Sequence, residues 1–323
     1  MRRQSADTPR RIVAALLLLI LLGALFWLVT QIGHALQSRG MQSGFDFLWQ
    51  PAGFSLSESW LVLPSNASYW QALLAGLLNS LRVALPALLL ATLLGTTIGA
   101  ARRSINGLAR GLALVYVETL RNIPLLLQLL AWYFCLTSLL PDNLHAWSPL
   151  PHFYLSKAGL AMPALVWHQG GLSVDYPQPA GFAIEGGTQL SPEFMSLLLA
   201  LSLYTATYIA EVVRSGLQAI ATDQSEAATL LGASAWQRFW RVEWPQALRV
   251  ILPPLGNQYL NLIKNSSLAV AIGYPDLMAV SNTTLNQTGR AFECLAIILV
   301  VYSLLSLLLV GLIGYFNRRA NRT

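Results

Sequence analysis

Charge is what this sequence has least of. Charged residues make up 11% of its 323 residues and hydrophobic residues 55%, whereas ordinary soluble domains carry roughly 25% charged residues. Lysine is rarest, with only Lys157 and Lys264 in the chain. This shortage argues against a soluble domain and indicates a membrane protein. The net charge of +6 does not point to nucleic acid, because the arginines cluster just outside apolar runs and so can orient the chain in a bilayer.

Residues that bind metals or form disulfides are also scarce. The two cysteines, Cys135 and Cys294, fall in apolar stretches, where buried thiols behave as small hydrophobic residues. The four histidines show no spacing typical of metal ligands. We therefore expect no metal site, no disulfide and no cofactor in this chain.

Catalytic motifs are missing as well. A chain that hydrolysed ATP would need a phosphate-binding loop ending in Lys-Ser or Lys-Thr, but Lys157 precedes Ala158 and Lys264 precedes Asn265. The sequence also has no HExxH, GxSxG or CxxC motif. We therefore expect a protein that is not an enzyme. If ATP drives its function, another chain must bind and hydrolyse the ATP.

Long apolar runs are what the sequence has instead. A membrane-spanning helix needs about 20 apolar residues, and we predict an all-α membrane protein with six transmembrane helices. The first, at 12–32, is longer than the apolar part of a signal peptide, and the arginines before it place the N-terminus in the cytoplasm. With six spans the C-terminus is cytoplasmic too. The other five spans begin near residues 73, 108, 192, 251 and 295.

These spans divide the chain into four parts. Residues 1–72 hold the cytoplasmic N-terminus, the first span and an outer loop, and residues 73–140 hold the second and third spans, with a break near Pro124. Residues 141–191 form a polar, proline-rich insertion whose lack of arginine suits the outer side. It could be a small cap or a poorly ordered excursion. Residues 192–323 hold the last three spans.

A polar, basic loop at 223–250 separates the fourth span from the fifth. Its spacing predicts a helix, a glycine turn and a second short helix, from Glu226, Ala227, Ala228, Gly232, Phe239 and Pro245. Gly232 can adopt the left-handed conformation that closes the first helix, and Ser234 can cap the second. Pro245 is expected to stop or bend that helix. A rigid helix-turn-helix of this kind can transmit force to a partner.

Polar side chains also occur inside the apolar segments. Glu118 and Arg121 stand three residues apart, as do Glu211 and Arg214, so each pair can neutralise its charges within a membrane. Such groups could line a pathway for a zwitterionic solute, or could be interhelical hydrogen bonds that hold a bundle together. The candidate pathway residues are Glu118, Arg121, Tyr204, Glu211, Asn257, Asn261, Lys264 and Asn265.

The loop resembles the EAA loop of permease subunits of bacterial ATP-binding-cassette (ABC) importers. Much of the chain from about Leu77 onward is similar to the polar amino-acid branch of that family. The stretches that carry this similarity are Val117–Leu125, Tyr208–Gly216, Pro245–Arg249, Lys264–Ala269 and Gly273–Leu277. The long insertion and the additional first span resemble the general L-amino-acid permeases within that branch.

The resemblance implies a MetI-like permease core in the bacterial inner membrane, surrounded by membrane lipid. It implies a dimer of cytoplasmic ATPases, a second permease subunit that is expected to be a different chain, and a periplasmic amino-acid-binding protein. In that scheme the helix at Glu226 docks in a cleft of an ATPase, which alone uses ATP; Gly232 permits the turn and Pro245 fixes the exit. Two alternatives stay open: a permease for another small solute, such as an opine or an organic cation, and a membrane scaffold that moves no solute.

Overall fold

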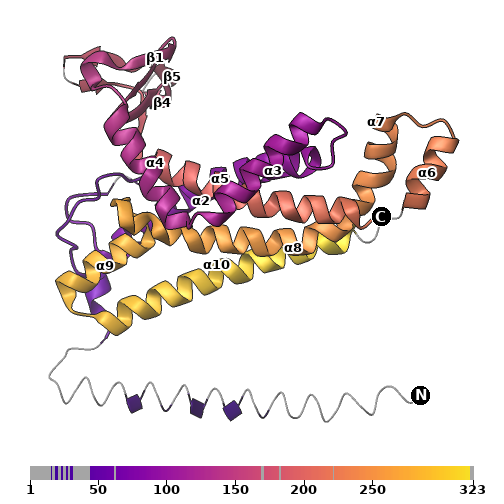
Figure 1. Cartoon of the computed structure of the whole chain (residues 1–323). Coiled ribbons are helices and arrows are strands. Elements are labelled where there is room, and N and C mark those ends of the chain that lie inside the picture. Colours follow the sequence, from indigo (N-terminus) through magenta and orange to yellow (C-terminus); the bar gives the residue numbers. More distant parts are fainter. Residues whose placement is uncertain are drawn as a thin grey trace.

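The computed structural model describes residues 44–320 except 62, 169–170, 182 and 221, together with residues 16, 19, 20, 23, 24, 27, 30 and 31. The expected cytoplasmic N-terminus and most of the expected first span therefore lie outside the described residues. From residue 44 onward the chain forms a bundle of long helices with a β-rich unit at one end (Figure 1).

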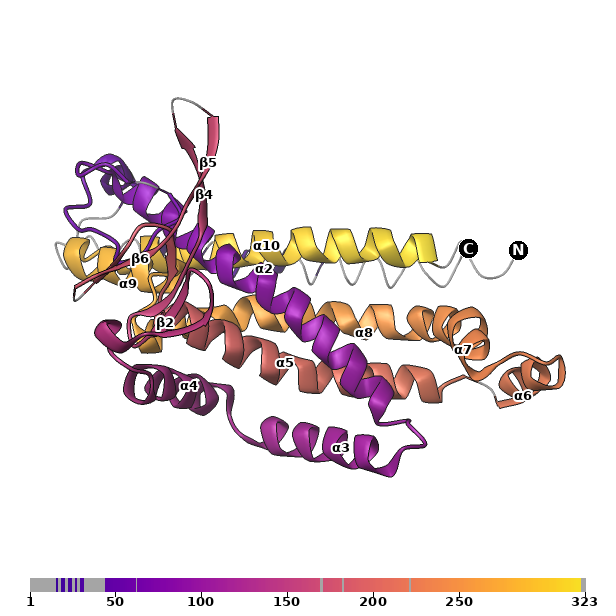
Figure 2. The ribbon, with the colours of Figure 1, turned by 90° about the horizontal axis from the view of Figure 1, so that it is seen from above.

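The bundle is built on the packing of α2 (Tyr69–Ala101) against α5 (Pro192–Gln218), which α2 crosses obliquely (Figure 2). α8 (Trp244–Asn265) packs on α5, and α10 (Ala291–Ala320) packs on α8. α4 (Leu125–Leu139) also packs against α5. A continuous apolar core therefore runs along α5, and the helices around it expose apolar surface on their outer faces.

Three of the described helices are long and apolar enough to cross a membrane, namely α2, α5 and residues 291–315 of α10. α3 (Gly107–Asn122) and α4 make a fourth if the pair is one span, with a bend of 102° between them. The bend confirms the expected break near Pro124, because a residue before proline is disfavoured in helical backbone. α8 falls outside this group. The predicted count of six spans is therefore not confirmed.

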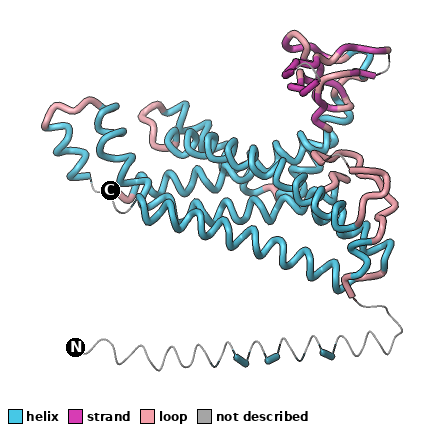
Figure 3. Tube along the Cα trace, turned by 180° about the vertical axis from the view of Figure 1, so that it is seen from behind, coloured by secondary structure: helices cyan, strands magenta, loops and turns pink. Residues whose placement is uncertain are grey.

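Residues 147–190 overturn the all-α prediction. β1 (Trp147–Leu150), β2 (Phe153–Ser156), β3 (Gly159–Met162) and β8 (Thr188–Leu190) form one antiparallel sheet, in that order. Two hairpins complete the unit, β4 (Ala164–His168) with β5 (Gly171–Asp175), and β6 (Gln178–Ala180) with β7 (Ala183–Glu185). Figure 3 shows all strands gathered at one end of the molecule. The insertion is thus a small unit of paired strands and not a poorly ordered excursion; that it caps the outer face stays a prediction.

Short helical elements complete the fold. η1 (Asp46–Trp49) precedes α2, and η2 (Asn143–His145) follows α4. After α8 come the 3-10 helix η4 (Ser266–Ile272) and α9 (Leu277–Thr288), which packs against α2 and α10. Gly273 and Gly289 have φ of +77° and +68° and end η4 and α9 in left-handed conformations that favour glycine.

The two ends of the bundle differ in chemistry. One end carries the strands together with α9, and we call it the strand end. The opposite end carries α6 (Thr222–Leu230), α7 (Ala235–Arg238) and the π-helical turn η3 (Phe239–Glu243) (Figure 1). We call it the arginine end, because Arg102 and Arg103 at the end of α2 lie beside Arg238 of α7 and Arg241 of η3.

Candidate functional site

The loop at the arginine end forms the predicted helix-turn-helix. α6 closes at Gly232, whose φ is +82°. The Gly232 amide donates to the carbonyl of Thr229, and the Ala233 amide donates to that of Ala228, both at 3.0 Å. These two bonds make a Schellman motif, which satisfies carbonyls at the end of the helix. The left-handed conformation predicted for Gly232 is therefore confirmed.

A reciprocal cap starts the second helix, as predicted. The Gln237 amide donates to Ser234 Oγ at 3.3 Å, and the Ser234 amide donates to Gln237 Oε1 at 3.0 Å. Hydrogen bonds donated by backbone amides thus hold both ends of the turn. The turn between α6 and α7 is therefore stabilised by hydrogen bonds within residues 228–237.

Pro245 does not stop the second helix, so the stop that was one of the two predicted outcomes is wrong. The chain does bend here, since α7 stands at an angle to α8 (Figure 1). Helical structure continues from α7 through η3 into α8, and Pro245 lies in the first turn of α8. The Trp244 amide donates to the carbonyl of Phe239, a π-helical bond that widens the turn just before the proline. A proline in a first turn needs no amide donor, so the chain passes into α8 without interruption.

The two faces of α6 have different surroundings. Glu226 and Ala227 are exposed, as are Leu230 and Leu231 with 90% and 89% of their surface accessible. The opposite face carries Ser225 and Thr229, one helical turn apart, whose hydroxyls bond to groups on η3 and α7. Ala228 is half-buried. The EAA motif therefore lies on a helix with one polar face turned inward and one partly apolar face turned outward.

An aromatic cluster forms the base of the loop. The ring of Phe239 lies 5.3 Å from that of Trp240 and 5.8 Å from that of Trp244, and Trp236 stacks edge-on to Trp240. Phe239 and Trp244 also pack against the bundle core. Trp236, at the other end of the cluster, is 71% exposed. The cluster thus anchors the loop at Phe239 and leaves apolar surface free at its tip.

Some of the candidate pathway residues meet between α5 and α8. A cavity of about 320 Å³ is lined by Tyr204, Thr205, Tyr208, Gln258, Asn261 and Asn265. The hydroxyls of Tyr204 and Tyr208 are 2.9 Å apart. The guanidinium of Arg121 lies over the ring of Tyr208, 5.4 Å from its centroid. Hydroxyl, amide and cationic groups are therefore combined here, which is the chemistry needed to hold a carboxylate and an ammonium group.

Glu211 is engaged elsewhere. It pairs with Arg214 on the same helix, as predicted, and Arg102 at the end of α2 donates to its Oε2 at 2.5 Å. Asn257 and Lys264 are exposed on α8 and do not line the cavity. In this structure Glu211 therefore fastens α2 to α5 instead of lining the cavity.

The expected pairing of Glu118 with Arg121 is wrong. Both side chains are exposed, and no ion pair joins them among the residues that the structure describes. A separation of three residues permits a contact on a helix without requiring one. Arg121 instead lies over the aromatic ring of Tyr208 on α5.

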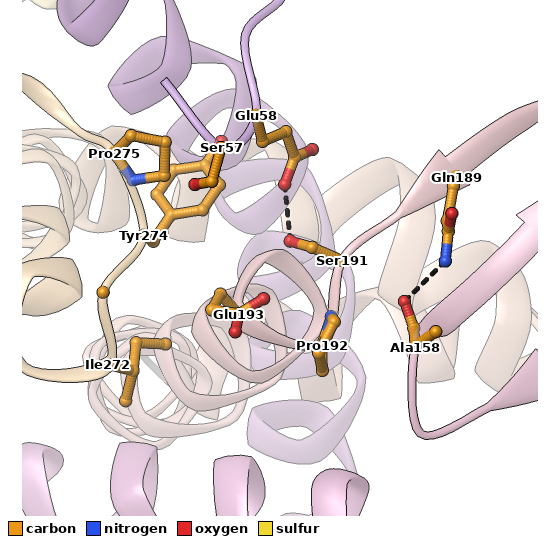
Figure 4. A pocket seen from close by; sticks show the side chains of 11 residues that line it. Ser57, Glu58, Ala158, Gln189, Ser191, Pro192, Glu193, Ile272, Tyr274 and Pro275 are labelled. Atoms are coloured by element: carbon orange, nitrogen blue, oxygen red, sulfur yellow. Dashed lines mark hydrogen bonds between the residues drawn. The ribbon is translucent and has the colours of Figure 1, made fainter. Parts of the chain in front are cut away.

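A second cavity, of about 550 Å³, lies at the strand end (Figure 4). Glu58 Oε1 accepts from Arg82 at 2.6 Å, and its Oε2 accepts from Ser191 Oγ at 2.5 Å. Glu58 therefore joins the outer loop to α2 and α5 and offers no free charge to a ligand. The cavity is lined by Ser57, Glu58, Ala158, Gln189, Ser191, Pro192, Glu193, Ile272, Gly273, Tyr274 and Pro275.

No metal centre is formed in the described part of the chain, where no three His, Cys, Asp or Glu side chains group to hold an ion. The two cysteines are free thiols, with Cys135 exposed and Cys294 buried.

The sequence analysis missed several residues of these sites. Tyr208 and Gln258 line the cavity but are not among the predicted pathway residues. Arg102 and Arg103 were interpreted only as markers of membrane orientation. One signal could have identified both arginines: they directly follow the long apolar helix α2, at the end of the bundle that also carries the basic loop.

Known proteins resemble this chain over most of its length. Residues 87–322 match the family described as "Binding-protein-dependent transport system inner membrane component". The chain is 37% identical to the General L-amino acid transport system permease protein AapQ of Rhizobium johnstonii, over 94% of this chain and 90% of that protein. It is 37% identical to the Putative amino-acid ABC transporter permease protein YhdX of Escherichia coli K12, over 92% and 90%.

A solved structure described as an amino acid ABC transporter with histidines has the same fold. Its TM-score is 0.58 at 27% sequence identity, and the match covers 78% of this chain and 95% of that chain. The helices of the bundle thus follow a known MetI-like arrangement.

Proposed function

Because this chain belongs to the family of binding-protein-dependent transport system inner membrane components, we propose that it is a permease subunit through which an ATP-driven importer moves L-amino acids across the bacterial inner membrane. It is a transport component and not an enzyme. The amino-acid substrate is supported by the relatives, two of which are named as amino-acid permeases at 37% identity over more than nine-tenths of this chain.

The single observation that carries the coupling role is the outward face of the loop. Leu230, Leu231 and Trp236 are 90%, 89% and 71% exposed on a turn whose backbone is capped on both sides. Exposed apolar groups on a rigid support are typical of a surface that a partner covers. We propose that the partner is a separate cytoplasmic ATPase, which alone binds and hydrolyses ATP, and that Glu226 and Ala227 lie in the contact.

The arrangement of charges supports the orientation. Arg102, Arg103, Arg238 and Arg241 gather at one end of the bundle, and basic residues favour the cytoplasmic side. The arginine end is then cytoplasmic and receives the ATPase, and the strand end faces the periplasm and the binding protein. The C-terminal end of α10 lies at the arginine end (Figure 1), which agrees with a cytoplasmic C-terminus.

The cavity between α5 and α8 is our candidate for part of the solute pathway. Tyr204, Asn261 and Asn265 line it, and Arg121 lies close by, over the ring of Tyr208. Polar groups inside a membrane are costly unless they face a cavity or one another. Asn257 and Lys264, exposed on the same helix, are candidates for the contact with a second permease subunit, which we propose is a different chain.

Uptake measurements test this function. Cells lacking this gene should lose uptake of several radiolabelled L-amino acids, and the wild-type gene should restore it. Gly232→Asp should insert in the membrane and not restore uptake. A Cβ at Gly232 would meet no atom within 4 Å, so the defect would come from backbone strain or from a charge placed against the partner.

A matched variant separates those two causes. Gly232→Asn has nearly the shape of Gly232→Asp without its charge, and asparagine tolerates the left-handed conformation comparatively well. We expect Gly232→Asn to retain more uptake than Gly232→Asp. If deletion of the gene changes the uptake of no amino acid, the proposed substrate is wrong, and opines and organic cations become the next solutes to assay. ATP-dependent accumulation of none of these solutes would indicate a scaffold.

A further inference from the structure

The π-helical turn ends in a carboxylate that the sequence analysis did not single out. Glu243 is the last residue of η3, and only 12% of its side chain is exposed. A carboxylate that is largely removed from water is costly unless its oxygens have partners. Both oxygens of Glu243 have partners, and these partners belong to different elements.

Side chains from α6, from α7 and from the turn after α2 face this carboxylate. Ser225 of α6 donates to Glu243 Oε1 at 2.9 Å, and Arg238 Nε of α7 lies 3.3 Å from the same oxygen. Arg103 Nη1, just beyond the end of α2, lies 4.0 Å from Oε2. The same nitrogen of Arg103 donates to the Leu217 carbonyl, near the end of α5, at 2.7 Å. Glu243 therefore links the loop to the ends of α2 and α5.

The apolar core does not anchor α6. It is nine residues long, a length at which an isolated helix is marginal in water. None of its described residues belongs to the buried core. Thr229 accepts from Arg238 Nη1 at 3.0 Å, one turn after Ser225. The hydroxyls of Ser225 and Thr229, which face Glu243 and Arg238, therefore help to set the direction of α6.

We propose that Glu243 is the positioning residue that makes α6 move together with the ends of α2 and α5. The proposal rests on the proposed coupling function of the loop. When a partner displaces α6, the Ser225–Glu243–Arg103 connection carries the displacement to α2 and α5, whose packing forms the centre of the bundle. Without the carboxylate, α6 tilts independently, and α2 and α5 keep their positions.

Amide hydrogen exchange tests the connection without partner or substrate. In the full chain in lipid nanodiscs, Glu243→Ala should raise the exchange of α6 amides about tenfold or more, because the charge-assisted hydrogen bond from Ser225 to Glu243 is lost and α6 opens locally. Exchange in α5 and in the body of α8 should not change. Arg241→Gln is the matched control, since it removes a charge from an exposed side chain of the same turn and should leave α6 unchanged.

A milder variant guards against misfolding. Ser225→Ala removes only the bond from α6 and should also raise exchange in α6, by a smaller factor. Exchange in α6 that stays within about twofold of wild type in both variants would overturn the proposal, because local opening would then not depend on this carboxylate.

The assembled importer tests the consequence for transport. Glu243→Gln keeps the size of the side chain and an acceptor for Ser225 but loses the charge that faces Arg103. The permease should still co-purify with its ATPase and hydrolyse ATP, and the number of amino acids moved per ATP should fall at least about fivefold, the lower range of coupling effects. A ratio equal to wild type would overturn the coupling role. If the wild type moves no amino acid, the proposed function is wrong. The hydrogen-exchange experiment then still tests whether Glu243 holds α6 in place.

Discussion

Asp276 shows how much a single side chain can depend on its surroundings. It begins α9 at the strand end, where its Oδ1 accepts from the Ala279 amide at 2.8 Å, while Oδ2 is buried without a hydrogen-bond partner among the described residues. Burial raises the pKa of this carboxyl to about 7. A carboxyl with a raised pKa keeps its proton in the folded protein at pH values where the unfolded chain has lost it.

The raised pKa of Asp276 predicts a pH-dependent stability. The contribution of the Asp276 carboxyl to the stability of the fold is complete below about pH 4, the ordinary pKa of an aspartate. It is lost as the pH rises through about 7. The thermal unfolding midpoint of the purified protein should therefore fall between pH 5 and pH 8.

The control for that prediction is Asp276→Asn, which preserves the cap and cannot ionise. This variant should show a flatter dependence on pH over the same range. An unchanged slope in Asp276→Asn would mean that another group causes the effect.

At the scale of elements, the contact between α2 and α5 depends on small residues. Gly95 and Gly99 lie one turn apart on α2, and a Cβ at Gly95 would come within 2.6 Å of the side chain of Ile209. Ile209 is fully buried, so it has little room to shift. Small residues at such crossings allow helix backbones to approach closely.

This packing predicts that Gly95→Ala destabilises the bundle by about 1–3 kcal/mol, the usual cost of overpacking a core. Gly111→Ala is the matched control, because Gly111 also lies inside a helix but a Cβ there meets nothing within 4 Å. That variant should be neutral or slightly stabilising, since alanine favours helices over glycine. Comparison of the unfolding midpoints of the two variants in detergent measures the difference. Equal midpoints would show that the crossing tolerates an extra methyl group.

At the scale of the whole molecule, the β-rich unit is separable from the bundle. The buried residues of the main apolar core come from the helices of the bundle, from η4 and from Tyr274 in the turn after it, and the strands contribute only the half-buried Leu190 at its edge. The unit contacts the helices chiefly through β3, next to the start of α5.

Replacement of residues 144–189 by a flexible glycine–serine linker should therefore leave the bundle folded. We expect a monodisperse protein whose unfolding midpoint is closer to wild type than that of Gly95→Ala, because the core remains intact. Size-exclusion chromatography and thermal unfolding in detergent provide the measurement. Aggregation of the shortened chain would show that the bundle requires the strands.

Features that depend on neighbouring residues can be predicted from the amino-acid sequence alone. The shortage of charge predicted a membrane protein, and the spacing of Glu226, Gly232 and Ser234 predicted a helix, a left-handed glycine and a cap. Capping and backbone conformation act over three to five residues, so they can be read from a short stretch. The break at Pro124 belongs to the same class. At Pro245 the predicted stop was wrong, because a π-helical turn leads the helix on into α8.

Contacts between residues far apart in the sequence are seen only in the folded molecule. Tyr204 and Asn261 line one cavity, and Glu243 faces Arg103 across 140 positions of sequence. Such contacts depend on how long helices cross, which periodicity along one helix does not specify. For the same reason Arg121 lies over Tyr208 and not beside Glu118. The strands of residues 147–190 are short and interrupted by proline and glycine, so the sequence does not show which strands pair. The pairing of β3 with β8, for example, is known only from the structure.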